Sequence, residues 1–163
     1  MKLDRDEAER LVQTYSDLIL RLSYTYLKST HDAEDICQTV FLKLLTSGQV
    51  FADPAHEKAW IIRTTANACK DLLRSAARRR TVGLEVVAEA AAPTPPDDGV
   101  LAAVMALPEN YRDAVYLYYY EGYPVREVAA LLGRSESAVS AHLSRGRNKL
   151  RTMLGGDYCE QSV

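Results

Sequence analysis

The sequence predicts an all-α protein with two small helical domains joined by a flexible linker, the second domain containing a helix-turn-helix. Three observations favour this class. Apolar residues recur every three or four positions in most segments, no segment alternates with the period of a strand, and one proline-rich stretch interrupts the helical pattern. The 163 residues are 47% hydrophobic and 26% charged, a composition typical of a globular domain.

Three amphipathic helices are expected before residue 81. Ser29–Asp32 separates the first helix from the second and offers N-cap side chains, and Pro54 is suited to begin the third. The third helix is expected to run to the arginines at 78–80. The side chains predicted to face the core are Leu11, Tyr15, Leu18, Leu22, Tyr26, Ile36, Val40, Phe41, Leu44, Ala59, Ile62, Ala66, Cys69 and Leu73.

Residues 81–100 have the character of a linker. They show no sustained amphipathic period, and the run APTPPDDG contains three prolines. We expect an extended, flexible tether whose acidic side chains repel DNA phosphates. The polar, glycine-led residues 155–163 are expected to form a disordered tail.

The pattern of residues 124–151 predicts a helix-turn-helix. A short helix stops at Gly133, and Ser135 can cap a longer one. The residues expected to face inward are Val128, Ala129, Leu132, Val139, Leu143, Gly146 and Leu150. A DNA-binding helix would present Ser137, Ser140, Ala141 and Ser144 to the major groove, and Arg145, Arg147 and Lys149 to phosphates. The alternative is an ordinary αα-hairpin with a solvated basic face.

A second basic cluster lies in NACKDLLRSAARRR, although the whole chain has a formal charge of −2. Phosphates respond to local charge, because a Debye length in solution is only about 8–10 Å. One side of the third helix carries Trp60, Arg63, Thr64, Asn67, Lys70, Asp71 and Arg74. An aromatic ring, an amide and cations in this order suit the unstacked bases and backbone of opened DNA. A solvated face is the alternative, and for Trp60 a core position is equally favoured.

Enzyme chemistry is not indicated. The three histidines, His31, His56 and His142, lie in separate segments, and no nucleophile–base pair is visible. The three cysteines, Cys37, Cys69 and Cys159, are far apart and form no CxxC pair, so reduced thiols without zinc are expected. We therefore expect no cofactor and no small-molecule substrate. The charged N-terminus and the lack of any run of about 20 apolar residues predict a cytoplasmic protein without membrane insertion.

Three stretches, in this order, resemble the extracytoplasmic-function (ECF) sigma factors of the sigma-seventy superfamily. They are DAEDICQTVFLKLL, AWIIRTTANACKDLLRSAARRR and LPENYRDAVYLYYYEGYPVREVAALLGRSESAVSAHLSRGRNKLR. The resemblance implies a region 2 domain at 1–80, a region 4 domain at 101–154 and a role in transcription initiation. A transcriptional regulator that uses only the helix-turn-helix is the rival interpretation. It leaves the arginine-rich segment before residue 81 without a function.

The resemblance also implies a role for each surface. The second helix would dock on the β′ clamp helices of core RNA polymerase through Asp32, Asp35, Gln38, Phe41 and Leu42. The minus-ten DNA would be held by Phe51, Trp60, Arg63, Asn67, Lys70, Arg74 and Arg78. Region 4 would contact the β flap and read the minus-thirty-five DNA through Ser135, Ser137, Ser140, Ala141, Ser144, Arg145, Arg147 and Lys149. Members of this family are commonly held inactive by an anti-sigma factor, which is therefore a candidate partner.

Overall fold

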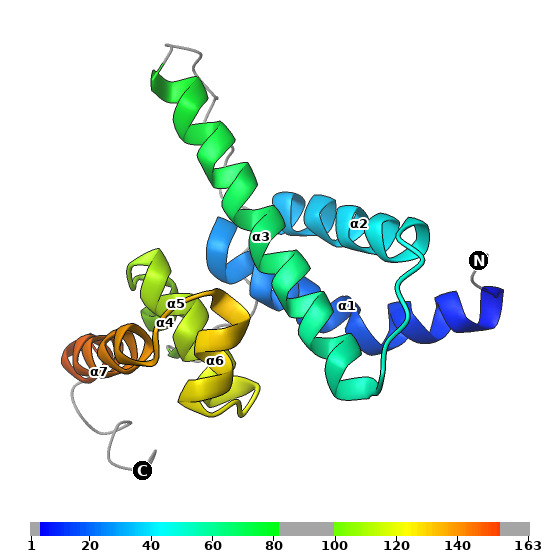
Figure 1. Ribbon diagram of the computed structural model, residues 1–163. Coiled ribbons are helices and arrows are strands. Elements are labelled where there is room, and N and C mark those ends of the chain that lie inside the picture. The colour runs from blue at the N-terminus through cyan, green and yellow to red at the C-terminus, as the bar shows by residue number, and fades with distance from the viewer. Residues whose placement is uncertain (1–3, 82–99, 154–163) are drawn as a thin grey trace. The chain divides into compact units, whose positions relative to one another are not determined.

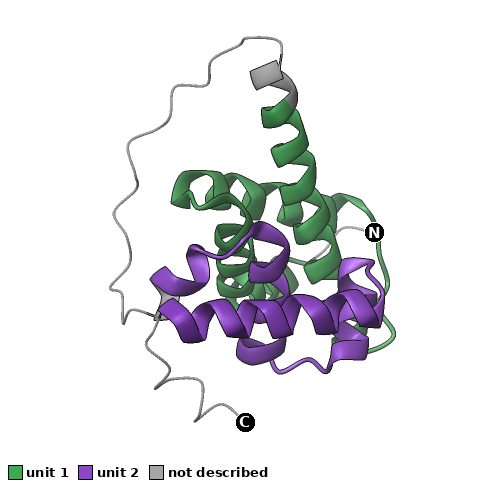
Figure 2. Ribbon diagram, turned by 90° about the vertical axis from the view of Figure 1, so that its left-hand side faces the viewer, with its two compact units in different colours: residues 1–92 green, residues 93–163 purple. Residues whose placement is uncertain are grey.

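The computed structural model describes residues 4–81 and 100–153, and all regular elements in these ranges are helical (Figure 1). The all-α prediction is confirmed for this part of the chain. The chain divides into two compact units, residues 1–92 (unit 1) and 93–163 (unit 2), which Figure 2 colours green and purple. The predicted tail at 155–163 lies outside the described residues. So does the predicted linker at 81–100, except for its end residues, which belong to helices.

Unit 1 is built from α1 (Arg5–Leu27), α2 (Thr30–Thr46) and α3 (Pro54–Thr81). α1 and α2 pack against each other, and α3 packs across both (Figure 1). The predicted apolar stripes are buried, with three exceptions that are only partly buried: Phe41, Ala59 and Leu73. Leu73 lies in the C-terminal half of α3, which extends past the other two helices. The side chains at the centre of the core are Ile19, Leu22, Val40, Ile61 and Ile62.

Polar contacts define where the helices of unit 1 begin. The Ser29 hydroxyl accepts a hydrogen bond from the Asp32 N–H at 3.1 Å, which confirms the predicted N-cap of α2. The start of α3 is fixed to α1 by the nearly buried carboxylate of Glu57. It accepts hydrogen bonds from the Tyr15 hydroxyl at 2.7 Å and from Arg10 Nη2 at 3.0 Å. These contacts hold the first turn of α3 in one position on α1.

Unit 2 contains α4 (Val100–Met105), α5 (Glu109–Val115), the π-helical turn η1 (Tyr116–Tyr120), α6 (Val125–Leu132) and α7 (Glu136–Met153). α7 packs on α5 and α6. Gly133 has φ +66°, the left-handed conformation in which glycine ends a helix, and Ser135 Oγ accepts from the Ala138 N–H at 3.0 Å. The predicted turn and cap of the helix-turn-helix are therefore confirmed.

One helix in unit 2 ends differently from the expectation. The helix that opens after Pro108 changes to π-helical hydrogen bonding before Gly122, with the Glu121 N–H bonded to the Tyr116 carbonyl at 3.2 Å. Hydrophobic periodicity does not detect this change, because it reports which faces are apolar and not the register of backbone hydrogen bonds. Tyr118, Tyr119 and Tyr120 are exposed in this turn.

A buried ion pair holds the turn of the helix-turn-helix on α5. Arg134 Nη1 donates to Asp113 Oδ1 at 2.9 Å, and Nη2 donates to Oδ2 at 2.5 Å. Nη1 also donates to the Asn110 carbonyl at 2.9 Å. Asp113 is fully buried, and its carboxylate is compensated by this guanidinium and by the Ala114 N–H, which donates to Oδ1 at 2.7 Å. The pair therefore positions the residues that lead into α7.

Replacing Arg134 with methionine should lower the free energy of unfolding of unit 2 by about 3–5 kcal/mol, because it removes the bidentate cationic partner of a buried carboxylate. Hydrogen exchange of peptides from residues 125–153, measured across a urea series on the full chain, gives this value. The matched control is Arg126→Met on the exposed side of α6, which should change it by less than about 0.5 kcal/mol. A change at Arg134 as small as that of the control would contradict the assigned role of the ion pair.

Candidate functional site

A polar strip follows the exposed side of α3. Arg63, Asn67 and Arg74 are exposed, and Lys70 is partly exposed. Residues three and four positions apart lie on the same side of a helix, so these predicted site residues share one face. Arg74 is 3.1 Å from the exposed carboxylate of Asp71, which offsets part of its charge. Thr64 is partly exposed beside this strip. The predicted site residue Arg78 belongs to α3, but its side chain lies outside the described residues.

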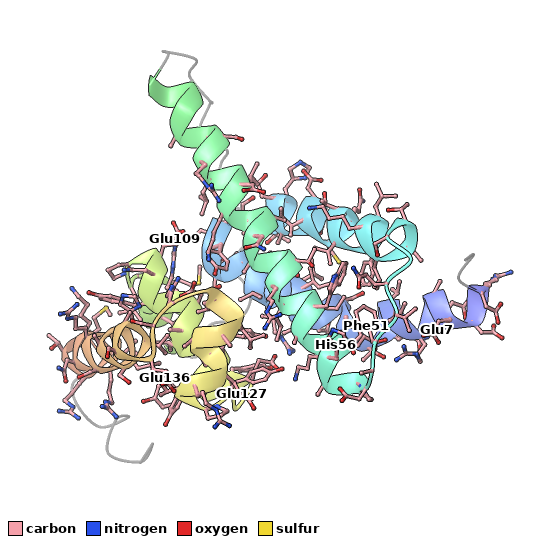
Figure 3. All side chains as sticks on the ribbon, in the orientation of Figure 1. Glu7, Phe51, His56, Glu109, Glu127 and Glu136 are labelled. Atoms are coloured by element: carbon pink, nitrogen blue, oxygen red, sulfur yellow. The ribbon has the colours of Figure 1, made fainter. Side chains whose placement is uncertain are left out.

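Phe51, His56 and Trp60 form an aromatic cluster at the start of α3. Phe51 and His56 are labelled in Figure 3. The Phe51 ring centroid lies 5.4 Å from that of His56 and 5.9 Å from that of Trp60, both in edge-to-face orientation. Phe51 and Trp60 are partly exposed, so Trp60 is neither fully buried in the core nor fully exposed to solvent. The cluster therefore presents aromatic surface to solvent beside the polar strip of α3.

The exposed side of α2 combines acidic, amide and apolar groups. Asp35 and Gln38 are exposed, and the Leu42 side chain is 63% exposed. Leu45, which the sequence analysis did not assign, is 43% exposed one helical turn further along. The predicted site residues Asp32 and Phe41 are partly buried. Asp35 lies 3.7 Å from His31 Nε2. Two large exposed leucines on one helix face are typical of an interaction surface.

The exposed side of α7 separates the predicted region 4 residues into two groups. Ser137, Ser140, Ser144 and Arg147 recur every three or four positions and share one face. Arg145 and Lys149 are exposed on another face. Ala141 is partly exposed, and Ser135 is exposed but its hydroxyl caps the helix. The structure thus places Arg147 with the serines, whereas the sequence analysis grouped it with the other two cations.

His142 lies on the side of α7 that faces α5. Its ring centroid is 5.4 Å from that of Tyr111, and Nδ1 is buried without a hydrogen-bond partner. Burial lowers the pKa of His142, the positive charge of Arg134 lowers it further, and Asp113 opposes the shift. The middle of α7 therefore carries no positive charge from this residue at neutral pH.

No helix within residues 4–81 or 100–153 has the length and hydropathy of a membrane span. In the same ranges, no group of three metal-ligating side chains was found.

Comparison with known families identifies both units. The family model for sigma-70 region 2 matches residues 11–79, and the model for sigma-70 region 4 matches residues 98–150. The ECF RNA polymerase sigma factor SigM of Mycobacterium tuberculosis is 30% identical over 155 residues, which cover 93% of this chain and 79% of that protein. This chain belongs to the ECF RNA polymerase sigma factors.

Other ECF sigma factors are similar over most of the chain. SigE of Mycolicibacterium smegmatis is 31% identical over 160 residues, and the match spans 90% of this chain but only 61% of that protein. Among solved structures, the sigma factor RpoE of Bartonella quintana, in complex with the anti-sigma factor NepR, has a TM-score of 0.76 at 20% identity. The superposition spans 91% of this chain and 97% of the RpoE chain. This likeness supports the fold.

The lowered pKa of His142 has a measurable consequence for stability. Unfolded histidine titrates near 6.5, so the unfolded chain takes up this proton before the folded chain does as the pH falls. The free energy of unfolding of unit 2 should therefore be insensitive to His142 well above pH 6.5 and should decrease as the pH falls through that value. His142→Gln should remove this part of the pH dependence.

An NMR titration of the His142 Hε1 resonance tests the direction of the shift. Its midpoint in the folded protein should lie below the midpoint of the same residue in the urea-unfolded chain. A midpoint equal to the unfolded value or above it would mean that the ring is not desolvated by its packing against Tyr111.

Proposed function

We propose that this sigma factor binds core RNA polymerase through α2, opens the minus-ten DNA with α3 and contacts the minus-thirty-five DNA with α7. One observation carries the proposal. Each of the segments matched by regions 2 and 4 has a helix that buries one face in the core and presents a polar, cationic face to solvent. The activity is that of an initiation factor without catalysis of its own. Its proposed partners are the β′ clamp helices, the β flap and promoter DNA.

The exposed face of α2 supports a protein partner. Leu42 and Leu45 supply apolar area, while Asp35 and Gln38 supply a polar border. Protein interfaces combine an apolar centre with a polar rim in this way. These four residues are unfavourable for contact with DNA, because their only charged group is the carboxylate of Asp35, which repels phosphates. We therefore assign this face to the β′ clamp helices.

The start of α3 supports contact with unpaired bases. Aromatic rings on which bases stack, beside cations that follow the backbone, are the usual means of binding single-stranded nucleic acid. Phe51 and Trp60 supply the rings, Asn67 a group that can bond to a base edge, and Arg63 and Arg74 the cations. These residues lie along one side of one helix and the loop before it. The arrangement suits a strand that has left the duplex.

The exposed side of α7 supports contact with duplex DNA. The short side chains of Ser137, Ser140 and Ser144 allow a helix to approach the floor of the major groove. Arg147 shares that face, so we assign it to a base or a nearby phosphate, and we assign Arg145 and Lys149 to the flanking phosphates. An anti-sigma factor stays a candidate partner on the family resemblance.

Run-off transcription with core polymerase and a genomic library tests the proposal as a whole. Transcripts that require both the chain and the core enzyme should appear and should share two promoter elements. A regulator that uses the helix-turn-helix alone would bind DNA without the core enzyme and would not support initiation. The absence of any transcript above the level with core polymerase alone would contradict the proposal.

Replacing Asp35 and Gln38 together with alanine should weaken binding to core polymerase, because interfacial polar contacts are worth about 1–3 kcal/mol each. Competition with a labelled sigma factor for the core enzyme measures the effect, and circular dichroism checks the helix content. The matched control is Gln13→Ala with Asp17→Ala, the same residue types exposed on α1. Equal competition by the two double variants would remove α2 from the docking surface.

Asn67→Ala should spare the closed promoter complex and reduce the open complex, because a base edge becomes available to the amide only after strand separation. Permanganate reactivity of promoter thymines reports the open complex, and a footprint at low temperature reports the closed one. A full open-complex signal in the variant would count against the role assigned to Asn67.

A further inference from the structure

His56 links the loop before α3 to the first turn of that helix. The Ala52 N–H donates to His56 Nδ1 at 3.1 Å, and the His56 N–H donates to Asp53 Oδ1 at 2.8 Å. Asp53 is the residue before the helix, and His56 is its third helical residue. In a capping box, glutamate or glutamine at this position accepts from the N–H of the N-cap residue, whereas His56 accepts from the N–H of Ala52, one residue earlier. Here a ring nitrogen accepts in place of the carboxylate or amide oxygen.

This contact determines which ring nitrogen carries the hydrogen when the imidazole of His56 is neutral. A nitrogen that accepts a hydrogen bond has no hydrogen, so the neutral imidazole has its proton on Nε2. His56 is exposed, and no partner for Nε2 is found within residues 4–81 and 100–153. The residue therefore offers one hydrogen-bond donor to a ligand, on the ring edge opposite the loop contact.

The donor lies beside the aromatic surface. The ring of Phe51 packs edge-to-face against both His56 and Trp60, and Figure 3 shows Phe51 and His56 next to each other at the start of α3. His56 thus packs directly against one of the two rings assigned to base stacking. We propose that His56 is a specificity-determining residue that donates from Nε2–H to a keto oxygen of an unpaired minus-ten base. The inference rests on the function proposed for α3.

The chemistry predicts which bases are preferred. Thymine O4 and guanine O6 accept hydrogen bonds, whereas cytosine N4 and adenine N6 donate at the equivalent position. A donor facing a donor leaves both without a partner, which costs binding free energy. His56 should therefore favour thymine or guanine over cytosine or adenine at one position of the element.

Four variants separate base recognition from support of the loop. Gln at position 56 can accept from the Ala52 N–H and still donate, so H56Q should retain the preference. Glu at position 56 can accept but cannot donate, so H56E should keep the loop contact and reverse the preference in favour of amino bases. H56A removes both contacts. Ala55→Glu adds the same negative charge one residue away and leaves His56 unchanged.

The experiment measures open complexes formed by the full chain and core polymerase on promoters randomised in the minus-ten element. The readout is the ratio of keto to amino bases at each position, which is independent of overall activity. Wild type should show a ratio of about tenfold at one position, the size of one good base contact. H56Q should stay within about threefold of wild type, as should Ala55→Glu, while H56A should approach a ratio of one and H56E should favour amino bases.

Three outcomes overturn the inference. They are a wild-type ratio near one at every position, an H56E ratio equal to that of wild type, and an H56Q ratio as low as that of H56A. The first two outcomes show that the Nε2–H of His56 does not select the base. The third shows that a hydrogen-bond donor at position 56 is not sufficient for the keto preference. If the wild-type chain forms no open complex on any promoter, the proposed function of α3 fails and this inference fails with it.

Discussion

Burial of one stripe of α3 determines the orientation of every other residue on that helix. Ile61, Ile62, Ala66 and Cys69 are buried against α1 and α2, and Thr65 is buried with its hydroxyl bonded to the Ile61 carbonyl at 2.7 Å. Each residue of an α-helix turns the side chain by about 100°. A shift by one residue would bring charged side chains into the core, which is far more costly than the loss of a few apolar contacts. The exposed strip of Arg63, Asn67 and Arg74 is therefore a consequence of core packing.

The same constraint operates in α7, with a tighter approach. Val139, Leu143 and Gly146 are buried, and a Cβ atom on Gly146 would lie 3.2 Å from Val115 Cγ2. The small residue lets α7 pack closely on α5. In each unit a polar clamp lies just before the exposed face begins: Glu57 with Tyr15 and Arg10 at the start of α3, and Arg134 with Asp113 before α7. Each unit thus combines apolar burial, which sets the rotation of a helix, with ionic contacts, which set the position of its first turns.

The features that sequence reasoning could predict depend on local chemistry. The apolar stripes of the helices, the Ser29 and Ser135 caps and the turn at Gly133 all follow from spacing and residue type over a few positions. The pair Asp113–Arg134 joins residues 21 positions apart, and nothing in the local pattern indicates that they meet. His56 could have been recognised as the third residue of a helix that begins at Pro54, but its ring accepts from Ala52 and not from the N-cap residue, a contact that no capping motif predicts. Helical periodicity alone could have predicted that Arg147 lies on a different face of α7 from Arg145 and Lys149.

Site-specific photo-crosslinking tests most directly whether the faces opposite the two buried stripes contact promoter DNA. The crosslinker p-benzoylphenylalanine replaces Asn67 on α3, Ser140 on α7 or, as the control, Gln13 on α1. The complexes contain core polymerase and a promoter obtained by run-off transcription. The account predicts a crosslink from position 67 to the minus-ten element that needs strand opening, a crosslink from position 140 to the minus-thirty-five element, and none from position 13. Crosslinks from positions 67 and 140 no stronger than those from position 13 would contradict it.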